Sequence, residues 1–224
     1  MKSSKQWQGE LLLAQGWAHY HGLAGDTTFH AHYPVQLVFS EACDATVTLD
    51  DRQITGRFLD IPSNAKHMLA PSQQPLNLLY IEPTLLEGNE GESRALPEWL
   101  SALRRRKATI DDTRMIRALE AIDDGLGGKV TQDMVACAAG MSKSSFTKLF
   151  RAIIGMPLRR YVLWRRLNVA VAEIGAGADA TQAAHKAGFA DSAHFSRTMR
   201  ETFGVSPTDS VLKIQMTVAE TPAV

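Results

Sequence analysis

Apolar and polar residues alternate or form short apolar runs in the N-terminal half of the chain. Runs at 10–14, 36–40, 46–49, 57–61 and 76–81 are separated by turn-forming residues, which predicts short strands in a small barrel or sandwich. Beyond about residue 111, apolar residues recur three and four positions apart, which predicts helices. We therefore expect an α+β protein, with a small N-terminal β-barrel followed by an all-α domain.

The helical half contains an internal repeat. Phe146, Lys148 and Gly155 of the first copy are matched in the second copy at a constant offset of 49 residues, by Phe195, Arg197 and Gly204. Each copy predicts a short helix, a glycine turn and a longer basic helix, which is the helix-turn-helix pattern. Two such units in tandem indicate sequence-specific binding to double-stranded DNA.

Both copies carry the same signals at the ends of the short helix. Thr131 and Asp179 are candidate N-caps, and Gln182 lies three residues after Asp179 as a capping-box partner. Gly140 and Gly188 stand where each short helix should stop at a positive φ. The longer helices are expected at about 142–153 and 191–202, and the helix that joins the units at about 159–173.

The outward face of each longer helix is rich in side chains that reach phosphates and base edges in a major groove. A solvated face is the alternative explanation, but it gives no reason for basic residues to recur in register. We therefore assign DNA binding to Lys143, Ser144, Ser145, Thr147, Lys148 and Arg151 in the first copy, and to Ser192, His194, Ser196, Arg197 and Arg200 in the second.

Residues 111–212 resemble the AraC/XylS family of transcriptional regulators. The resemblance implies two helix-turn-helix units joined by one long helix. Departures from the family pattern are Ala183-Ala184, Met199 and Ser210, which predict looser packing of the second unit. The motifs that carry the resemblance are Gly140-Met141-Ser142, Gly155-Met156-Pro157-Leu158, Arg166-Leu167, Gly188-Phe189, Phe195-Ser196-Arg197 and Gly204-Val205-Ser206-Pro207.

The charge distribution supports this interpretation although the whole chain of 224 residues is neutral, with 24 basic and 24 acidic residues. Between residues 129 and 213 there are 12 Lys and Arg against 6 Asp and Glu, a net charge of 12 − 6 = +6. The helical half therefore offers the basic surface that nucleic-acid binding needs. The sequence shows no long apolar run and no leader, so we expect a cytoplasmic protein without a membrane segment.

The two cysteines show no disulfide or zinc spacing. Cys43 and Cys137 lie far apart in the sequence, and Cys137 falls on the first helix of a turn unit. We expect Cys137 to be a small buried residue of that helix.

The N-terminal half resembles a degenerate cupin. His30-Ala31-His32 is followed by Gln36 where cupins have Glu, and Pro62-Ser63-Asn64 leads to His67 with Asn64 in place of Gly. On a strand, His-x-His would place both imidazoles on one face. His30, His32, Gln36 and His67 are therefore the candidate ligand-binding residues.

Three interpretations of these four residues remain open. They bind an organic effector in the mouth of the barrel, they hold a metal ion, or they only maintain a structural, dimerising domain. The neutral amide of Gln36 disfavours a tightly held metal, so no cofactor is assigned. A cupin enzyme is the least favoured alternative, because half of the chain forms two DNA-binding units.

We divide the chain into a cupin-like sensing or dimerising domain (1–82), a linker with one short helix (83–110) and a DNA-binding domain (111–224). In the linker, 87–92 is polar, whereas Trp99, Leu100 and Leu103 predict a helix that pairs with a symmetry mate. The expected function is a non-enzymatic transcriptional regulator. Its candidate partners are DNA, a small-molecule effector, RNA polymerase and a second copy of the chain.

Overall fold

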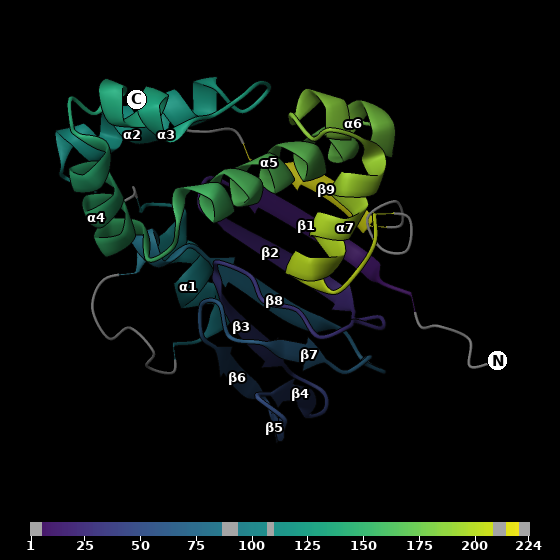
Figure 1. The fold of residues 1–224 in the computed structure, drawn as a ribbon. Coiled ribbons are helices and arrows are strands. Elements are labelled where there is room, and N and C mark those ends of the chain that lie inside the picture. Colours follow the sequence, from purple (N-terminus) through teal and green to yellow (C-terminus); the bar gives the residue numbers. More distant parts are fainter. Residues whose placement is uncertain (1–5, 87–93, 107–109, 208–213, 220–224) are drawn as a thin grey trace.

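The computed structural model describes residues 6–86, 94–106, 110–207 and 214–219. Two sheets, antiparallel except for one parallel edge strand, form what we call the sheet domain (Figure 1). The six-stranded sheet has the order β6-β3-β8-β2-β1-β9, and the three-stranded sheet has the order β5-β4-β7. The strands are β1 (Gln8–Ala14), β2 (Trp17–Leu23), β3 (Val35–Ser40), β4 (Ala45–Leu49), β5 (Arg52–Gly56), β6 (Phe58–Ile61), β7 (His67–Leu69), β8 (Leu76–Ile81) and β9 (Ile214–Val218).

The five predicted strands correspond to β1, β3, β4, β6 and β8. The sequence analysis missed four others. β2 and β5 are the second arms of hairpins with β1 and β4, and β7 has three residues, too few for alternation to be recognised. The fourth, β9, lies beyond the helices and pairs in parallel with β1, from Gly9 opposite Ile214 to Leu13 opposite Val218.

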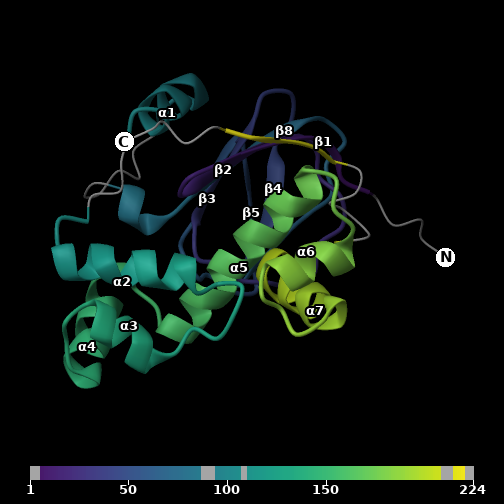
Figure 2. The same ribbon diagram turned by 90° about the horizontal axis from the view of Figure 1, so that it is seen from above.

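The helical domain contains the two predicted units, one at each end of a long helix (Figures 1 and 2). The first unit holds α2 (Thr113–Asp124), α3 (Gln132–Ala138) and α4 (Lys143–Ile154). The second unit holds α6 (Ala180–Lys186) and α7 (Ser192–Phe203), and α5 (Leu158–Gly175) joins the two. No helix among the described residues has the length and apolar character needed to cross a bilayer.

The predicted helix caps are confirmed. The Thr131 hydroxyl accepts a hydrogen bond from the Met134 backbone N–H at 3.2 Å. Asp179 and Gln182 form a complete capping box at the start of α6. Gly140 and Gly188 have φ values of 65° and 78°. Cys137 was expected to be buried and is exposed, because α3 buries Val135 and Ala136 and turns the next residue outward.

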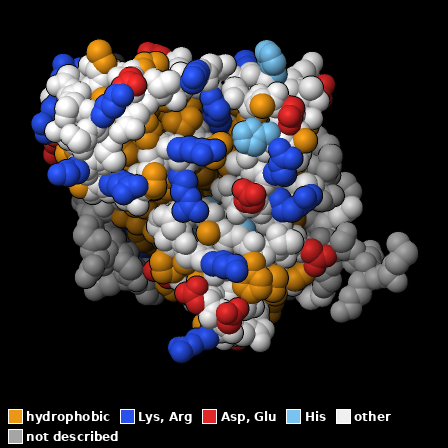
Figure 3. All heavy atoms as spheres, viewed as in Figure 1, with side chains coloured by type: hydrophobic (Ala, Val, Ile, Leu, Met, Phe, Trp, Pro, Cys, Tyr) orange, Lys and Arg blue, Asp and Glu red, His pale blue; other side chains and the backbone are white. Residues whose placement is uncertain are grey.

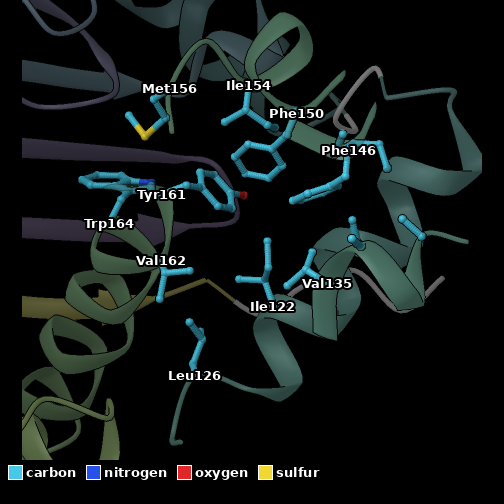
Figure 4. Close-up of a cluster of buried hydrophobic side chains, with 14 of the residues drawn as sticks. Ile122, Leu126, Val135, Phe146, Phe150, Ile154, Met156, Tyr161, Val162 and Trp164 are labelled. Carbon is cyan, nitrogen blue, oxygen red and sulfur yellow. The ribbon is translucent and has the colours of Figure 1, made fainter. Parts of the chain in front are cut away.

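Aromatic side chains form the core of the first unit and reach the sheet domain (Figure 4). The ring centroids of Phe146 and Phe150 lie 5.3 Å apart, and Phe150 is 5.6 Å from Tyr161 of α5. Tyr161 in turn meets Tyr33 of the sheet domain edge to face at 6.0 Å. This core therefore connects the two domains.

The linker does not provide the expected dimerisation helix. A short 3-10 helix, η1 (Pro83–Leu85), follows β8, and the predicted helix is α1 (Leu96–Leu103). Trp99 and Leu103 of α1 are buried against the six-stranded sheet of the same chain. That sheet face is apolar and has to be covered, so the apolar side of α1 is used inside the chain. The polar stretch expected at residues 87–92 lies outside the described residues.

Candidate functional site

The longer helices of the two units, α4 and α7, lie at opposite ends of α5 (Figure 2). Ser142 caps α4 and Asp191 caps α7, each by accepting from a backbone N–H of the first turn. α5 has 18 residues and is therefore about 27 Å long at 1.5 Å per residue. One continuous helix thus fixes the spacing between two equivalent helices.

The residues predicted to bind DNA all lie on α4 and α7 with at least part of their surface accessible. Several of them already have a partner in the chain. The Lys143 ammonium pairs with Asp133, the Gln132 side-chain amide donates to the Thr147 hydroxyl, and the His194 ring packs on Phe189 at 5.3 Å. The partly exposed residues are Thr147, Ser192, His194 and Ser196. The exposed residues are Lys143, Ser144, Ser145, Lys148, Arg151, Arg197 and Arg200.

The basic surface extends beyond the two helices. Lys and Arg side chains are spread over the face shown in Figure 3, from α4 across α5 to α7. Arg159 and Arg160, in the first turn of α5, are exposed between the two units. The sequence analysis did not assign them to the interface, although a basic pair directly after Pro157 at a helix start was a visible signal.

Four predicted ligand-binding residues come together in the sheet domain. His30, His32, Gln36 and His67 are all buried, and one ligand nitrogen from each histidine lies within 4.8 Å of the others. We call these four residues the histidine cluster. His30 and His32 were expected on one strand, and this was wrong. β3 begins only at Val35, after Pro34, which has no N–H to donate to a strand ladder.

Backbone carbonyl groups fix the orientation of the three imidazole rings. The Nδ1 atoms of His30, His32 and His67 lie 2.8, 2.8 and 3.0 Å from the carbonyl oxygens of Thr28, Pro34 and Ala65. A carbonyl oxygen only accepts, so each Nδ1 carries the proton and each neutral ring presents a lone pair on Nε2.

The Gln36 side chain bridges two of these Nε2 atoms. One end of its amide lies 2.9 Å from Nε2 of His32 and 3.1 Å from Nε2 of His67. Because both nitrogens are acceptors, the amide end that faces them has to be the NH₂ group, which has two hydrogens to donate. Gln36 therefore satisfies the pair as a neutral network without a metal ion.

Burial keeps the histidines uncharged. Burial first, and then the charge of the neighbouring imidazoles, lower the pKa of His30 to about 3 and that of His32 to about 4. Burial also lowers the pKa of His67. Three neutral imidazoles are in the protonation state that a metal ion requires of its ligands.

Two adjoining cavities lie between the sheet domain and the helical domain. A cavity of about 300 Å³ lies between the β1–β2 turn and α5, with Glu82, Arg165 and Asn168 among its polar walls. A second cavity of about 120 Å³ is mostly apolar. The histidine cluster lines neither of these two cavities. The residues common to both are Leu13, Ala18, Tyr80, Trp164 and Asn168.

The sequence matches one family model and one curated relative. The family model of a helix-turn-helix domain matches residues 135–210. The probable transcriptional regulator LumQ of Photobacterium leiognathi is 27% identical over 123 residues, which cover 52% of this chain and 50% of LumQ. The chain thus spans about half the length of this curated relative.

The fold is similar to that of ToxT from Vibrio cholerae over most of both chains. An apo ToxT structure has a TM-score of 0.58 at 10% identity, covering 86% of this chain and 96% of ToxT. ToxT with a bound unsaturated fatty acid has a TM-score of 0.53 at 12% identity and covers 92% of this chain and 94% of ToxT. The protein therefore carries a helix-turn-helix domain over residues 135–210, together with a sheet domain arranged as in ToxT.

Proposed function

We propose that this protein is a transcriptional regulator that binds double-stranded DNA through α4 and α7 and adjusts that binding to a small molecule. The single observation that carries the DNA-binding part is the duplication of a basic, exposed helix at both ends of α5. One rigid helix of about 27 Å suits two recognition helices that enter successive major grooves on one side of the duplex.

Selection from a random DNA library tests this function. We expect a selected motif with two half-sites about one helical turn apart. The affinity for that motif should fall steeply with salt, because Lys and Arg release counterions from the phosphates they contact. Failure to select any motif, or binding that does not depend on salt, would contradict the proposal.

We place the small-molecule site in the two cavities between the domains. A molecule there would touch β1, β2 and α5 together, so its binding would be linked to the arrangement of the domains. The apolar walls favour a largely apolar ligand, and Arg165 and Asn168 at the wider end favour a polar or acidic head group. ToxT, which shares this fold, has been crystallised with an unsaturated fatty acid and with a naphthalenyl butenoic acid.

A thermal-shift assay with a long-chain unsaturated fatty acid tests the cavity. A ligand that binds the folded state raises the melting temperature. Ala172 lines the wider cavity, and Ala172→Trp should fill it and abolish the shift. Ala152→Trp, at an exposed site on α4, is the control and should retain the shift. If both variants still show the rise in melting temperature, this ligand class does not bind in this cavity. The same conclusion follows if neither the wild type nor the variants show it.

The histidine cluster is a second candidate site, for a divalent transition-metal ion. One ligand nitrogen of each of the three buried imidazoles lies within 4.8 Å of the others, and a carbonyl group fixes Nδ1 of each ring, which favours this role. Imidazole nitrogen suits Zn²⁺ and its neighbours. His30, His32 and His67 would hold the ion, and Gln36 would give up its hydrogen bonds to His32 and His67.

Metal analysis and Co²⁺ absorption spectra of the purified protein test the metal site. His32→Ala should remove the bound metal, whereas His185→Ala, at an exposed position on α6, should not. A metal-free wild type without a Co²⁺ spectrum would restrict the cluster to a structural role. If no ligand or metal binds and the full chain is a dimer in solution, the alternative of a purely dimerising domain is favoured.

A further inference from the structure

The C-terminal end of α7 lies against a loop of the sheet domain formed by residues 27–31, which we call the seat. The backbone N–H and the hydroxyl of Thr28 both donate to the Gly204 carbonyl, at 3.0 and 3.3 Å. The Ala31 N–H donates to the Glu201 carbonyl at 3.4 Å. Carbonyl groups in the last turn of a helix have no helical donor, so the seat satisfies groups that α7 leaves open.

Phe203, the last residue of α7, connects the seat with the histidine cluster and the cavities. Its ring centroid lies 6.2 Å from that of His32, 6.3 Å from Tyr80 and 5.9 Å from Trp164 of α5. Phe203 also lines the smaller cavity. The end of α7 therefore contacts both candidate sites directly.

The internal repeat provides an unseated counterpart of this helix end. Gly155 ends α4 with φ 79°, and Gly204 ends α7 with φ 71°, so both have the same left-handed backbone. A Cβ atom on Gly155 would meet nothing within 4 Å. On Gly204, a Cβ atom would lie 2.5 Å from the Thr28 carbonyl oxygen and 2.7 Å from Nδ1 of His30. Only the second of these two glycines is packed against the seat.

We propose that the seat positions the second recognition helix on DNA, and that Thr28, His30 and Phe203 are the positioning residues. This inference rests on the proposed function. In helix-turn-helix units the N-terminal part of the recognition helix contacts the bases. The seat holds the opposite end of α7, so Ser192 and Arg197 stay accessible while the sheet domain sets the direction of the helix. The half-site read by α7 is thus the one that responds to the sheet domain.

Gly204→Ala and Gly155→Ala form a matched pair that tests the seat in the full chain. Both variants place a Cβ on a left-handed glycine, but only Gly204→Ala collides with the seat. Hydrogen exchange reports the contact itself: the Thr28 and Ala31 amides should exchange faster in Gly204→Ala than in Gly155→Ala. Unchanged exchange of both amides in Gly204→Ala would overturn the proposal.

DNA affinity gives the second readout, with the motif that the wild type selects. The half-site read by α7 is identified as the one at which Arg197→Ala changes base preference. We expect Gly204→Ala to lose about tenfold in affinity and to become insensitive to scrambling of that half-site. Gly155→Ala should stay sensitive to both half-sites. Equal losses at both half-sites in Gly204→Ala would show that the seat does not position α7.

A second variant covers the case in which Gly204→Ala does not fold. Phe203→Leu keeps an apolar side chain at the helix end but removes the aromatic contacts with His32 and Tyr80. It should weaken binding at the α7 half-site selectively, with an unchanged circular dichroism spectrum. Wild-type affinity in this variant would overturn the proposal. A wild-type chain that selects no DNA motif would instead contradict the proposed function, while the exchange experiment would still test the seat.

Discussion

The indole Nε1 of Trp164 donates a hydrogen bond of 2.7 Å to the Glu82 carboxylate, which joins the middle of α5 to the end of β8. Both side chains are buried. Burial raises the pKa of Glu82, and the hydrogen bond from Trp164 and the charge of Arg165 oppose that rise. This pair is therefore a buried polar link between the two domains.

Removing the indole donor should destabilise the protein. Trp164→Phe leaves the buried Glu82 carboxyl without this partner, at an expected cost of about 1–3 kcal/mol in the free energy of unfolding. Trp99→Phe is the matched control, because the buried Trp99 Nε1 has no hydrogen-bond partner within the described part of the chain. Urea unfolding of both variants should show a larger loss for Trp164→Phe, and equal losses would contradict the prediction.

Glu82→Gln should change how stability depends on pH. A carboxyl group with a raised pKa in the folded state contributes stability below its ordinary value of 4.5 and loses that contribution as pH rises through the folded pKa. Glutamine keeps the acceptor and never ionises. The variant should therefore gain stability relative to the wild type between about pH 4.5 and neutrality. Urea unfolding across this range measures the difference, and a pH-independent difference would rule out ionisation of Glu82 as its cause.

The histidine cluster should make the protein sensitive to acid. The pKa values of its histidines are lowered in the folded state, so the unfolded chain takes up protons first below the ordinary pKa of 6.5. His30 and His32 then each cost about 1.4 kcal/mol at one pH unit below 6.5. His32→Gln should lose less stability than the wild type between about pH 7.5 and pH 5.5 in urea titrations. An identical loss in both proteins would contradict this assignment.

Arg197 and Lys148 occupy equivalent positions of the repeat, and both are exposed. Arginine can bind guanine through two parallel hydrogen bonds, whereas lysine acts as a point charge. Arg197→Ala should cost about 1–3 kcal/mol and relax base preference in one half-site. Lys148→Ala should weaken binding with less change in preference.

Binding-site selection on both variants checks this difference. Arg117→Ala removes a positive charge from an exposed position of α2, outside the two recognition helices, and serves as the control. If Arg197→Ala and Lys148→Ala lose base preference equally, the predicted difference between the two positions is wrong.

Local signals allowed the helical domain to be predicted closely. Thr131, Asp179 and the left-handed glycines determine helix ends within a few residues, so α4 and α7 were placed within one residue. The joining helix was expected at about 159–173 and extends over Leu158–Gly175. In the sheet domain, the cupin-like motifs predicted that the four residues of the histidine cluster lie together, as they do. The strand that was expected to carry His30 and His32 does not exist.

Contacts between distant segments could not be predicted. The hydrogen bond from Thr28 to Gly204 spans 176 residues, and no local pattern at either residue specifies its partner. The same holds for the cavities, whose walls combine β1, β2, α5 and β9. Alternation and helical spacing define which face of an element is apolar, but they do not define which other face covers it.

The return of β9 to β1 has a consequence for how the chain folds. Gly9 pairs with Ile214, 214 − 9 = 205 residues later, so this contact closes a loop that includes most of the described residues. Contacts of such sequence separation form late, and β1 remains an open sheet edge on a growing polypeptide until the last strand emerges. Open edges invite pairing with other chains. The yield of soluble protein should therefore depend on residues 214–218, even though no part of that strand belongs to α4 or α7.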